Sequence, residues 1–484
     1  MVGARSERSE PPRQRAISAW RGRQDLNASP VTLGTSGSPS VWRGEHRPLT
    51  IGIVSLITLM AFEGIGSATA MPVVARELNA LSAYTWAFNA FVVASLLGMV
   101  VGGLWSDSKG PQGPLVSGVL SFTLGALIAG GAMNVSTLVL GRALQGLGAG
   151  AVIVAVYVLI ARSYPDSLRP KAFSMLAAAW VIPALIGPVI AGWLSDNVSW
   201  RAVFWLVPLF VIPPCLLLLP RLAQYQGGTP QSSTRQRLLA GVLATVGLLA
   251  LQDGVLRLSG VGAAEAVTGL VVLLVSVRYL LPNGALAFRR GLPASVMMRG
   301  LIAAAYFGAE VFVPLALIET RGVSTTAAGI ILAAAAAFWS VGSYVQSRLP
   351  GDRDRSNAVR LGAAIVGLSL VTLPLAVLTS LPPWIAVFSW ALGAFGMGLA
   401  IPSVSVQVMR LSPEADQGVN SASIQIVDSV LCVVAIALLG LVHALAVQSG
   451  GATAGTYSAL WLGAAGFAVA AILVAGRMRP SLSS

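Results

Sequence analysis

Residues 49–71 read LTIGIVSLITLMAFEGIGSATAM, an apolar run that contains a single charged side chain, Glu63. A helix rises about 1.5 Å per residue, so a run of this length crosses the roughly 30 Å of hydrocarbon in a bilayer. Apolar runs of similar length recur along the chain and bring the total to 14. The pattern predicts an all-α polytopic membrane protein with 14 spans.

The predicted spans fall into groups of six, two and six. The first group is Leu49–Met71, Tyr84–Leu104, Leu115–Met133, Leu138–Ala161, Ala172–Leu194 and Ala202–Leu219. The central pair is Leu238–Leu256 and Ala263–Leu281. The last group is Val296–Ile318, Ala327–Val345, Leu361–Leu378, Trp384–Val408, Ala422–Leu445 and Tyr457–Ala475.

This grouping predicts seven segments. They are a cytoplasmic tail (1–48), a six-helix bundle (49–219), a linker (220–237), an extra helix pair (238–281), a second linker (282–295), a second six-helix bundle (296–476) and a C-terminal tail (477–484). The first tail is polar and rich in Arg, Ser and Pro, so we expect it to be disordered. It does not resemble a secretory signal, because the first apolar stretch after it is a full-length span.

The composition supports a membrane location. Hydrophobic residues make up 55% of the chain and charged residues 10%, whereas a soluble domain has about 25% charged residues. The net charge is +13. Basic chains include nucleic-acid binders, but membrane proteins collect Arg in their cytoplasmic loops, and we favour that interpretation. We therefore expect a lipid bilayer and no nucleic acid as partner.

Basic residues also predict the orientation. With the N-terminus inside, 26 Lys and Arg side chains fall on the cytoplasmic side, 4 fall outside and Arg142 lies within a span. The positive-inside rule then places both termini in the cytoplasm. We expect a multi-pass protein of a bacterial-type inner membrane.

Cysteine and histidine give no sign of a metal, cofactor or redox site. Cys215 and Cys432 lie in separate apolar runs, and His46 and His443 are far apart in the sequence. A membrane-embedded transferase would need clustered His, Asp or Glu at a membrane surface, and no such cluster is evident. We expect no cofactor and no enzymatic activity.

Five charged residues fall within spans, where charge is costly and marks candidate functional groups. They are Glu63, Arg142, Asp253, Glu310 and Asp428. Glu63 and Glu310 each lie 14 residues, roughly 21 Å, from the inner end of the first span of their half. Arg142 lies about 6 Å from the outer end of its span, so it can meet Glu63 as a buried pair.

Burial raises the pKa of a carboxyl group and a neighbouring cation lowers it. A carboxyl group under both influences can bind and release a proton as its surroundings change. We therefore assign proton coupling to Glu63, Arg142 and Glu310. The alternative is a permanently paired or neutral acid that fixes helix packing. Asp428 either lines a cavity or faces water, and for Asp253 we favour a structural role.

Several polar amides within spans either line a cavity or hold helices together. The candidate cavity residues are Asn89, Gln145 and Gln425, and Gln407 shows the same pattern. Gly146, Gly148 and Gly150 imitate part of a dinucleotide fingerprint, but they lie within an apolar run and do not follow a strand. Close helix packing explains these glycines better.

Four short motifs stand in order on the first five spans. Glu63 is followed nine residues later by Pro72, and the loop after the second span is GLWSDSKG, with Gly103, Asp107 and Gly110. The fourth span contains RALQGLG from Arg142 to Gly148. The fifth contains Gly187, Pro188 and Gly192, followed by Trp200 and Arg201.

Together these motifs resemble the major facilitator superfamily, and in particular its fourteen-span drug:proton antiporters. The resemblance covers roughly residues 49–476. It implies two six-helix bundles related by a pseudo-two-fold axis, with a central cavity near the midplane. It also implies that Gly103, Asp107 and Gly110 help to lock one conformation from the cytoplasmic side, with the span near Asn420 as the partner of Asp107.

The function implied is proton-coupled export of small amphipathic compounds by alternating access, by a chain that works as a monomer. Gly187, Pro188 and Gly192 match a motif typical of exporters. Three alternatives remain: uptake of substrate together with protons, transport of a lipid or metabolite, and a transporter-like sensor. A sensor would tend to carry a sizeable soluble domain, and the longest soluble segment here is the 48-residue tail.

Overall fold

The computed structural model describes residues 3, 41–42, 46–81, 84–165, 168–222, 234–349, 355–378, 381–413 and 417–479. The predicted tail 1–48 and the linker 220–237 lie mostly outside the described residues, as does most of the tail 477–484. The described part of the chain consists of helices joined by turns and loops, and it contains no strand.

The first half of the described chain supplies helices α2 to α8. They are α2 (His46–Glu77), α3 (Tyr84–Lys109), α4 (Gln112–Gly130), α5 (Val135–Ser163), α6 (Arg169–Ala178), α7 (Val181–Asn197) and α8 (Arg201–Leu222). The extra pair is α9 (Thr234–Leu256) and α10 (Gly260–Val277).

The second half supplies helices α11 to α18 and a final short turn. They are α11 (Leu292–Glu310), α12 (Phe312–Arg321), α13 (Thr325–Ser347), α14 (Ser356–Thr372), α15 (Leu375–Leu378), α16 (Ile385–Leu411), α17 (Gln417–Gln448), α18 (Ala454–Val474) and the 3-10 helix η3 (Ala475–Met478).

These helices confirm the predicted fold class. In the described part, 13 helical stretches are long and apolar enough to cross a membrane, and Val181–Asn197 is a shorter apolar helix. Together with α6, that shorter helix occupies the predicted fifth span. Each of the other predicted spans coincides with one of the 13 stretches, which gives 14 in all.

Prolines explain why three spans are broken into two helices. A proline has no backbone N–H, so the carbonyl group four residues before it loses its helical donor. Pro183, Pro314 and Pro374 free the carbonyls of Ala179, Glu310 and Leu370 in this way. The breaks α6/α7, α11/α12 and α14/α15 lie at these positions.

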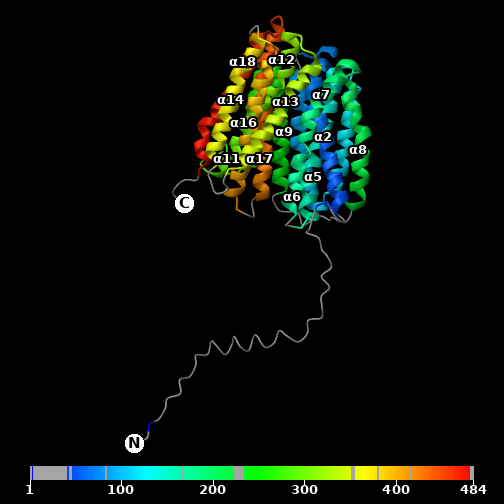
Figure 1. Cartoon of the computed structure of the whole chain (residues 1–484), viewed down its shortest axis with the longest axis vertical. Helices are drawn as coiled ribbons and strands as arrows, with labels where there is room; N and C mark the ends of the chain where they lie inside the picture. The colour runs from blue at the N-terminus through cyan, green and yellow to red at the C-terminus, as the bar shows by residue number, and fades with distance from the viewer. Residues whose placement is uncertain are drawn as a thin grey trace.

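The two bundles lie side by side with their helices roughly parallel to one long direction (Figure 1). We call the end where α2 begins and η3 ends the terminal face, and the opposite end the far face. In Figure 1, α6 lies at the terminal face and α12 at the far face. Helix α9 packs against α3 of the first bundle and α17 of the second, so the extra pair lies at the seam between them.

Large apolar side chains are exposed on the outside of the bundles, for example Leu120 (64% exposed), Leu209 (63%) and Leu473 (74%). Such a surface is unfavourable in water and favourable in lipid. The exposed apolar belt therefore agrees with a multi-pass membrane protein.

Glycines allow α5 to pack closely against its two neighbours. A Cβ on Gly146 or Gly150 would collide with the carbonyl oxygens of Phe91 and Ser95 in α3. A Cβ on Gly148 would collide with the carbonyl oxygen of Gly118 in α4. The packing interpretation of these three glycines is confirmed, and the resemblance to a dinucleotide site is accidental.

We expect Gly146→Ala to lower the free energy of unfolding by about 1–3 kcal/mol, because the new methyl group meets the Phe91 carbonyl oxygen and must push α3 away. Thermal unfolding of the purified protein in one detergent measures the effect. Gly466→Ala is the matched control, since Gly466 has no neighbour within 4 Å of an added Cβ. Equal melting temperatures for both variants would contradict the close packing of α3 and α5.

Candidate functional site

A buried ion pair joins α5 to α2. Arg142 Nη1 donates a hydrogen bond of 2.9 Å to Glu63 Oε1 and another of 3.1 Å to Gln145 Oε1. The Glu63 residue is 0% exposed and Arg142 is 3% exposed. The pair that the depths of the two residues predicted is therefore formed in the structure.

Helix α3 holds the guanidinium group of Arg142 from a second side. Arg142 Nε donates to the carbonyl oxygen of Ala87 at 3.1 Å, and the guanidinium carbon lies 4.5 Å from the centre of the Phe91 ring. This arrangement needs α3 and α5 at close range, which Gly146 permits. The orientation of the arginine thus depends on packing as well as on charge.

The hydrogen bonds around the pair are incomplete. Glu63 Oε2 and Gln145 Nε2 are buried and have no hydrogen-bond partner among the described residues. A buried polar atom without a partner costs about 1–3 kcal/mol, so its retention calls for an explanation. The free carboxylate oxygen is the atom at which Glu63 can accept a proton.

The other predicted cavity amides have different surroundings. Asn89 is buried and its side-chain amide donates to Gln252 Oε1 of α9, and Gln252 in turn donates to Thr85 Oγ1 at 3.1 Å. Asn89 therefore fastens the extra helix pair to α3. Gln145 binds Arg142, and Gln425 lies half-buried on α17.

Glu310 lies at the break between α11 and α12, where Pro314 has freed its carbonyl group. Its carboxylate has no hydrogen bond or ion pair with the residues that the structure describes, Glu63 included. One turn before it, Tyr306 stacks on Trp390 with ring centres 4.2 Å apart and meets Trp339 edge-on at 6.0 Å. The acid is thus next to an aromatic cluster of the second bundle.

Asp428 of α17 forms a second acid–arginine pair. Arg299 Nε of α11 donates to Asp428 Oδ2 at 2.7 Å, and both side chains are less than one-fifth exposed. Asp428 Oδ1 is buried without a described partner. The sequence indicates Asp428 but not Arg299, because Arg299 lies near the inner end of its span, where basic residues are common.

The predicted loop motif lies where α3 ends at the terminal face. Gly110 has a φ of 89°, a left-handed conformation that favours glycine, and it ends the helix. Gly103 has only an ordinary contact with Val154. Asp107 is exposed and makes no ion pair or hydrogen bond with the residues whose side chains the structure describes. Most side chains next to Asn420 lie outside that set, so the expected bond to this span stays a prediction.

The fifth-span motif brings the two bundles together near the far face. A Cβ on Gly192 would collide with the backbone of Thr325, and Gly329 of α13 touches the carbonyl oxygen of Pro188. Gly187 has looser contact with Phe62. The motif thus lies where α7 of the first bundle and α13 of the second bundle approach each other closely.

Asp196, at the end of α7, binds the start of α13. Its carboxylate accepts hydrogen bonds from Thr325 N at 3.2 Å, Thr326 N at 2.8 Å and Thr326 Oγ1 at 2.6 Å. A carboxylate is favoured at a helix N-terminus because of the free N–H groups and the helix dipole. We call this contact the far-face latch.

Two further interactions support the far-face latch. Arg76 of α2 pairs with Glu319 of α12 at 2.6 Å. The hydroxyl group of Tyr84 in α3 donates to the carbonyl oxygen of Val311, in the α11/α12 break, at 2.8 Å. Sequence reasoning missed all of these residues because their partners are more than 100 positions away.

A metal site is not found in the described part of the chain, where no group of three or more His, Cys, Asp and Glu residues comes together. The chemistry that these residues offer is proton binding, ion pairing and hydrogen bonding. The charged groups within the spans that offer this chemistry are the two acid–arginine pairs and Glu310.

The family model of the Major Facilitator Superfamily matches residues 51–436. The chain therefore belongs to the Major Facilitator Superfamily. It is a transporter by family and a multi-pass membrane protein by structure.

Two relatives illustrate the range of similarity. The chain is 25% identical over 373 residues to an uncharacterized MFS-type transporter of Mycobacterium tuberculosis. This match covers 73% of this chain and 53% of the relative. It is also 25% identical over 425 residues to the multidrug transporter protein MdtP of Bacillus subtilis. That match covers 82% of this chain and 76% of the relative. The chain thus spans about half the length of the mycobacterial relative.

Solved structures share the fold at low sequence identity. A peptide transporter POT in complex with alafosfalin has a TM-score of 0.66 and 14% identity, with 90% of this chain and 96% of that chain covered. A POT family transporter in complex with 5-aminolevulinic acid has a TM-score of 0.65 and 13% identity, with 88% and 94% covered. These similarities concern the arrangement of helices.

We expect Arg142→Met to lower the free energy of unfolding by about 3–5 kcal/mol, because it leaves Glu63 buried without its cation. The double variant Glu63→Gln with Arg142→Met removes both charges, so its free energy of unfolding should fall by less. Thermal unfolding of the three proteins in the same detergent makes the comparison. A double variant at least as unstable as the single one would show that the buried charge is not the source of the loss.

We expect Asp196→Ala to shift the protein toward an open far face on the order of tenfold, since it removes a charged acceptor worth about 1.5–3 kcal/mol. Spin labels at Met133→Cys and Leu381→Cys, in a Cys215→Ala and Cys432→Ala background, report the distance between the bundles. Asp253→Ala is the matched control, because Asp253 pairs with Arg257 within the extra helix pair. An unchanged distance distribution in Asp196→Ala would rule out the far-face latch.

Proposed function

We propose that this protein exports small amphipathic compounds from the cytoplasm in exchange for protons, by alternating access. The observation that supports this best is the fully buried Glu63–Arg142 pair, in which one carboxylate oxygen lacks a partner. Structural pairing alone would favour a carboxylate with both oxygens bonded. A free oxygen suits a group that binds and releases a proton.

Protonation of Glu63 removes the negative charge that Arg142 neutralises. The arginine then carries an uncompensated charge in a medium of low polarity, which destabilises the arrangement of α2, α3 and α5. When Glu63 releases the proton, the charged pair forms again and stabilises the original arrangement of these helices. The proton therefore changes the relative free energies of two conformations, and transport follows if they open to opposite sides.

The far-face latch supports a conformation in which the far face is closed. Asp196, Arg76 and Tyr84 of the first bundle all bind backbone or side chains of the second bundle there. At the terminal face, the proposal requires that the lock through Asp107 is released in this conformation. In our proposal the terminal face is cytoplasmic, both termini lie on that side, and this conformation receives substrate from the cytoplasm.

The proposed substrate class rests on the second bundle. Tyr306 and Trp390, which are buried, and Trp339, which is half-buried, form an aromatic cluster one turn from Glu310. In our proposal this cluster binds flat apolar groups when the bundles move apart, and the acid binds or repels charge according to its protonation. Cationic and neutral amphipathic compounds fit both features. MdtP, a multidrug transporter by name, is a relative in keeping with this class.

The proposed location is the inner membrane of a bacterial-type cell, with one chain as the working unit. Each bundle carries its own acid–arginine pair, and the bundles contact each other within a single chain. No second copy is needed to complete this arrangement.

We expect an imposed proton gradient to drive accumulation of cationic dyes in everted vesicles that contain the wild type. Glu63→Gln should reduce accumulation to the level of vesicles without the protein, because its amide cannot carry a proton. Glu265→Gln is the matched control, since Glu265 lies in the extra helix pair. Fluorescence of the dyes is the readout.

Each outcome of this experiment separates one part of the proposal. Equal accumulation by the wild type and Glu63→Gln would remove Glu63 from the coupling and direct attention to Glu310. Gradient-driven loss of compound from the vesicles would indicate uptake in the cell. If no amphipathic compound moves, the proposed substrate class is wrong, and lipids or metabolites become the substrates to test.

A further inference from the structure

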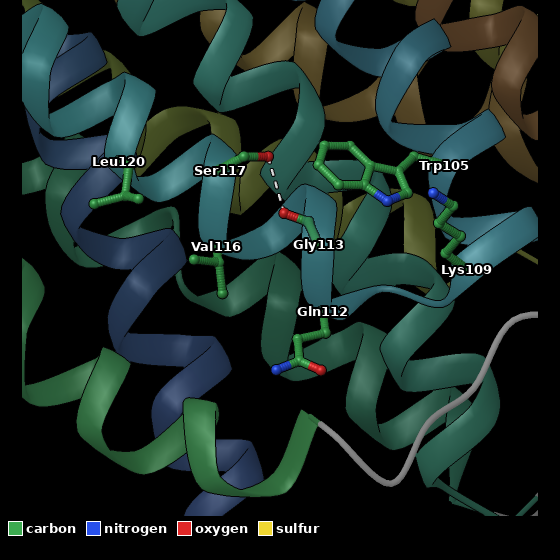
Figure 2. A pocket seen from close by; sticks show the side chains of 7 residues that line it. All are labelled: Trp105, Lys109, Gln112, Gly113, Val116, Ser117 and Leu120. Atoms are coloured by element: carbon green, nitrogen blue, oxygen red, sulfur yellow. Dashed lines mark hydrogen bonds between the residues drawn. The ribbon is translucent and has the colours of Figure 1, made fainter.

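A hollow of about 460 Å³ lies on the outside of the first bundle, where α3 ends and α4 begins (Figure 2). It is lined by Trp105, Lys109, Gln112, Gly113, Val116, Ser117 and Leu120. The position is the terminal face, at the level where the membrane spans end. The hollow is separate from the Glu63–Arg142 pair, which is buried between α2, α3 and α5.

One side of the hollow offers hydrogen-bond donors and a positive charge. The Lys109 ammonium, the Gln112 amide and the Trp105 indole N–H donate to no described residue. Ser117 is different, because its hydroxyl group donates to the carbonyl oxygen of Gly113 at 2.9 Å. Asp107 also lies on α3 but does not line the hollow, so the charge of the lining residues is positive.

The indole ring of Trp105 forms a wall of the hollow. It packs directly on Gly113, where any side chain would collide with the ring. Tryptophan prefers the boundary between hydrocarbon and water, with its ring among lipid head groups. Gly113 therefore fixes an interfacial aromatic ring next to the Lys109 ammonium, as Figure 2 shows.

The other side of the hollow continues into an apolar stripe on α4. Leu120 is 64% exposed, and Leu124 and Leu127 follow at helical spacing with 53% and 47% exposed. Val116 lies one turn before Leu120 and completes the stripe. In a membrane these side chains face lipid tails. A cationic polar end and a long apolar stripe thus meet in one groove.

We propose that this groove binds an anionic phospholipid of the leaflet at the terminal face. Its phosphate lies near Lys109 and Gln112, its glycerol region contacts Trp105, and one acyl chain follows Val116, Leu120 and Leu124. The occupant is a lipid and not a soluble anion, because the apolar stripe contributes only to a molecule with a hydrocarbon chain. The groove adjoins the loop that contains Asp107, so the bound lipid contacts the segment between the second and third spans.

Native mass spectrometry of the full chain in detergent tests this proposal with phosphatidylglycerol and phosphatidylcholine of identical acyl chains. We expect the wild type to retain phosphatidylglycerol in preference to phosphatidylcholine. Lys109→Ala should lower that preference about fivefold, the value of one basic residue near an anionic surface. Lys109→Arg should retain it, because the charge remains.

Lys171→Ala is the matched control, since it removes the only other lysine, which is exposed on α6 at the same face. The proposal is overturned if Lys109→Ala loses no more phosphatidylglycerol than Lys171→Ala, or if the wild type binds both lipids equally. Displacement of phosphatidylglycerol by excess inorganic phosphate would likewise overturn it, because the site would then recognise phosphate without the chain.

Discussion

Hydrocarbon offers no hydrogen-bond partner, and this constraint governs the whole molecule. Each backbone N–H and C=O within the bilayer must be satisfied inside the protein, so the spans are helices. The three broken spans show the same rule at its limits. Pro183, Pro314 and Pro374 each remove one donor, and the helix breaks beside the carbonyl that loses it. At the α11/α12 break, Tyr84 of the other bundle supplies a hydrogen bond to Val311, which ties a local defect to the contact between bundles.

Polar side chains follow the same rule, and they meet one another across helices. Arg142 joins Glu63, Gln145 and the backbone of α3, and Arg299 joins Asp428. The extra helix pair is held in a similar way through Gln252. Glu63 Oε2 and Asp428 Oδ1 remain buried without a described partner, and our proposal assigns the proton to Glu63.

The two faces of the protein differ in how the bundles are joined. At the far face, glycines allow α7 and α13 to touch, and the Asp196 carboxylate completes the start of α13. At the terminal face, Asp107 of the loop motif is exposed at the end of α3. At the far face an acid at a helix start thus joins the two bundles, and for Asp107 at the terminal face such a contact stays a prediction.

The sequence by itself determined the helices and their number, because length and apolarity decide which segments cross a bilayer. It also indicated Glu63, Arg142, Glu310 and Asp428, since a charge within an apolar run is conspicuous. Tertiary structure alone decided the partners: Asp196 with α13, Gln252 with Asn89, and Arg299 with Asp428. These pairs join segments far apart in the chain, and a single sequence carries no record of which distant helix faces which. Interhelical packing decides which helices face each other, and this packing depends on the shapes of many side chains at once.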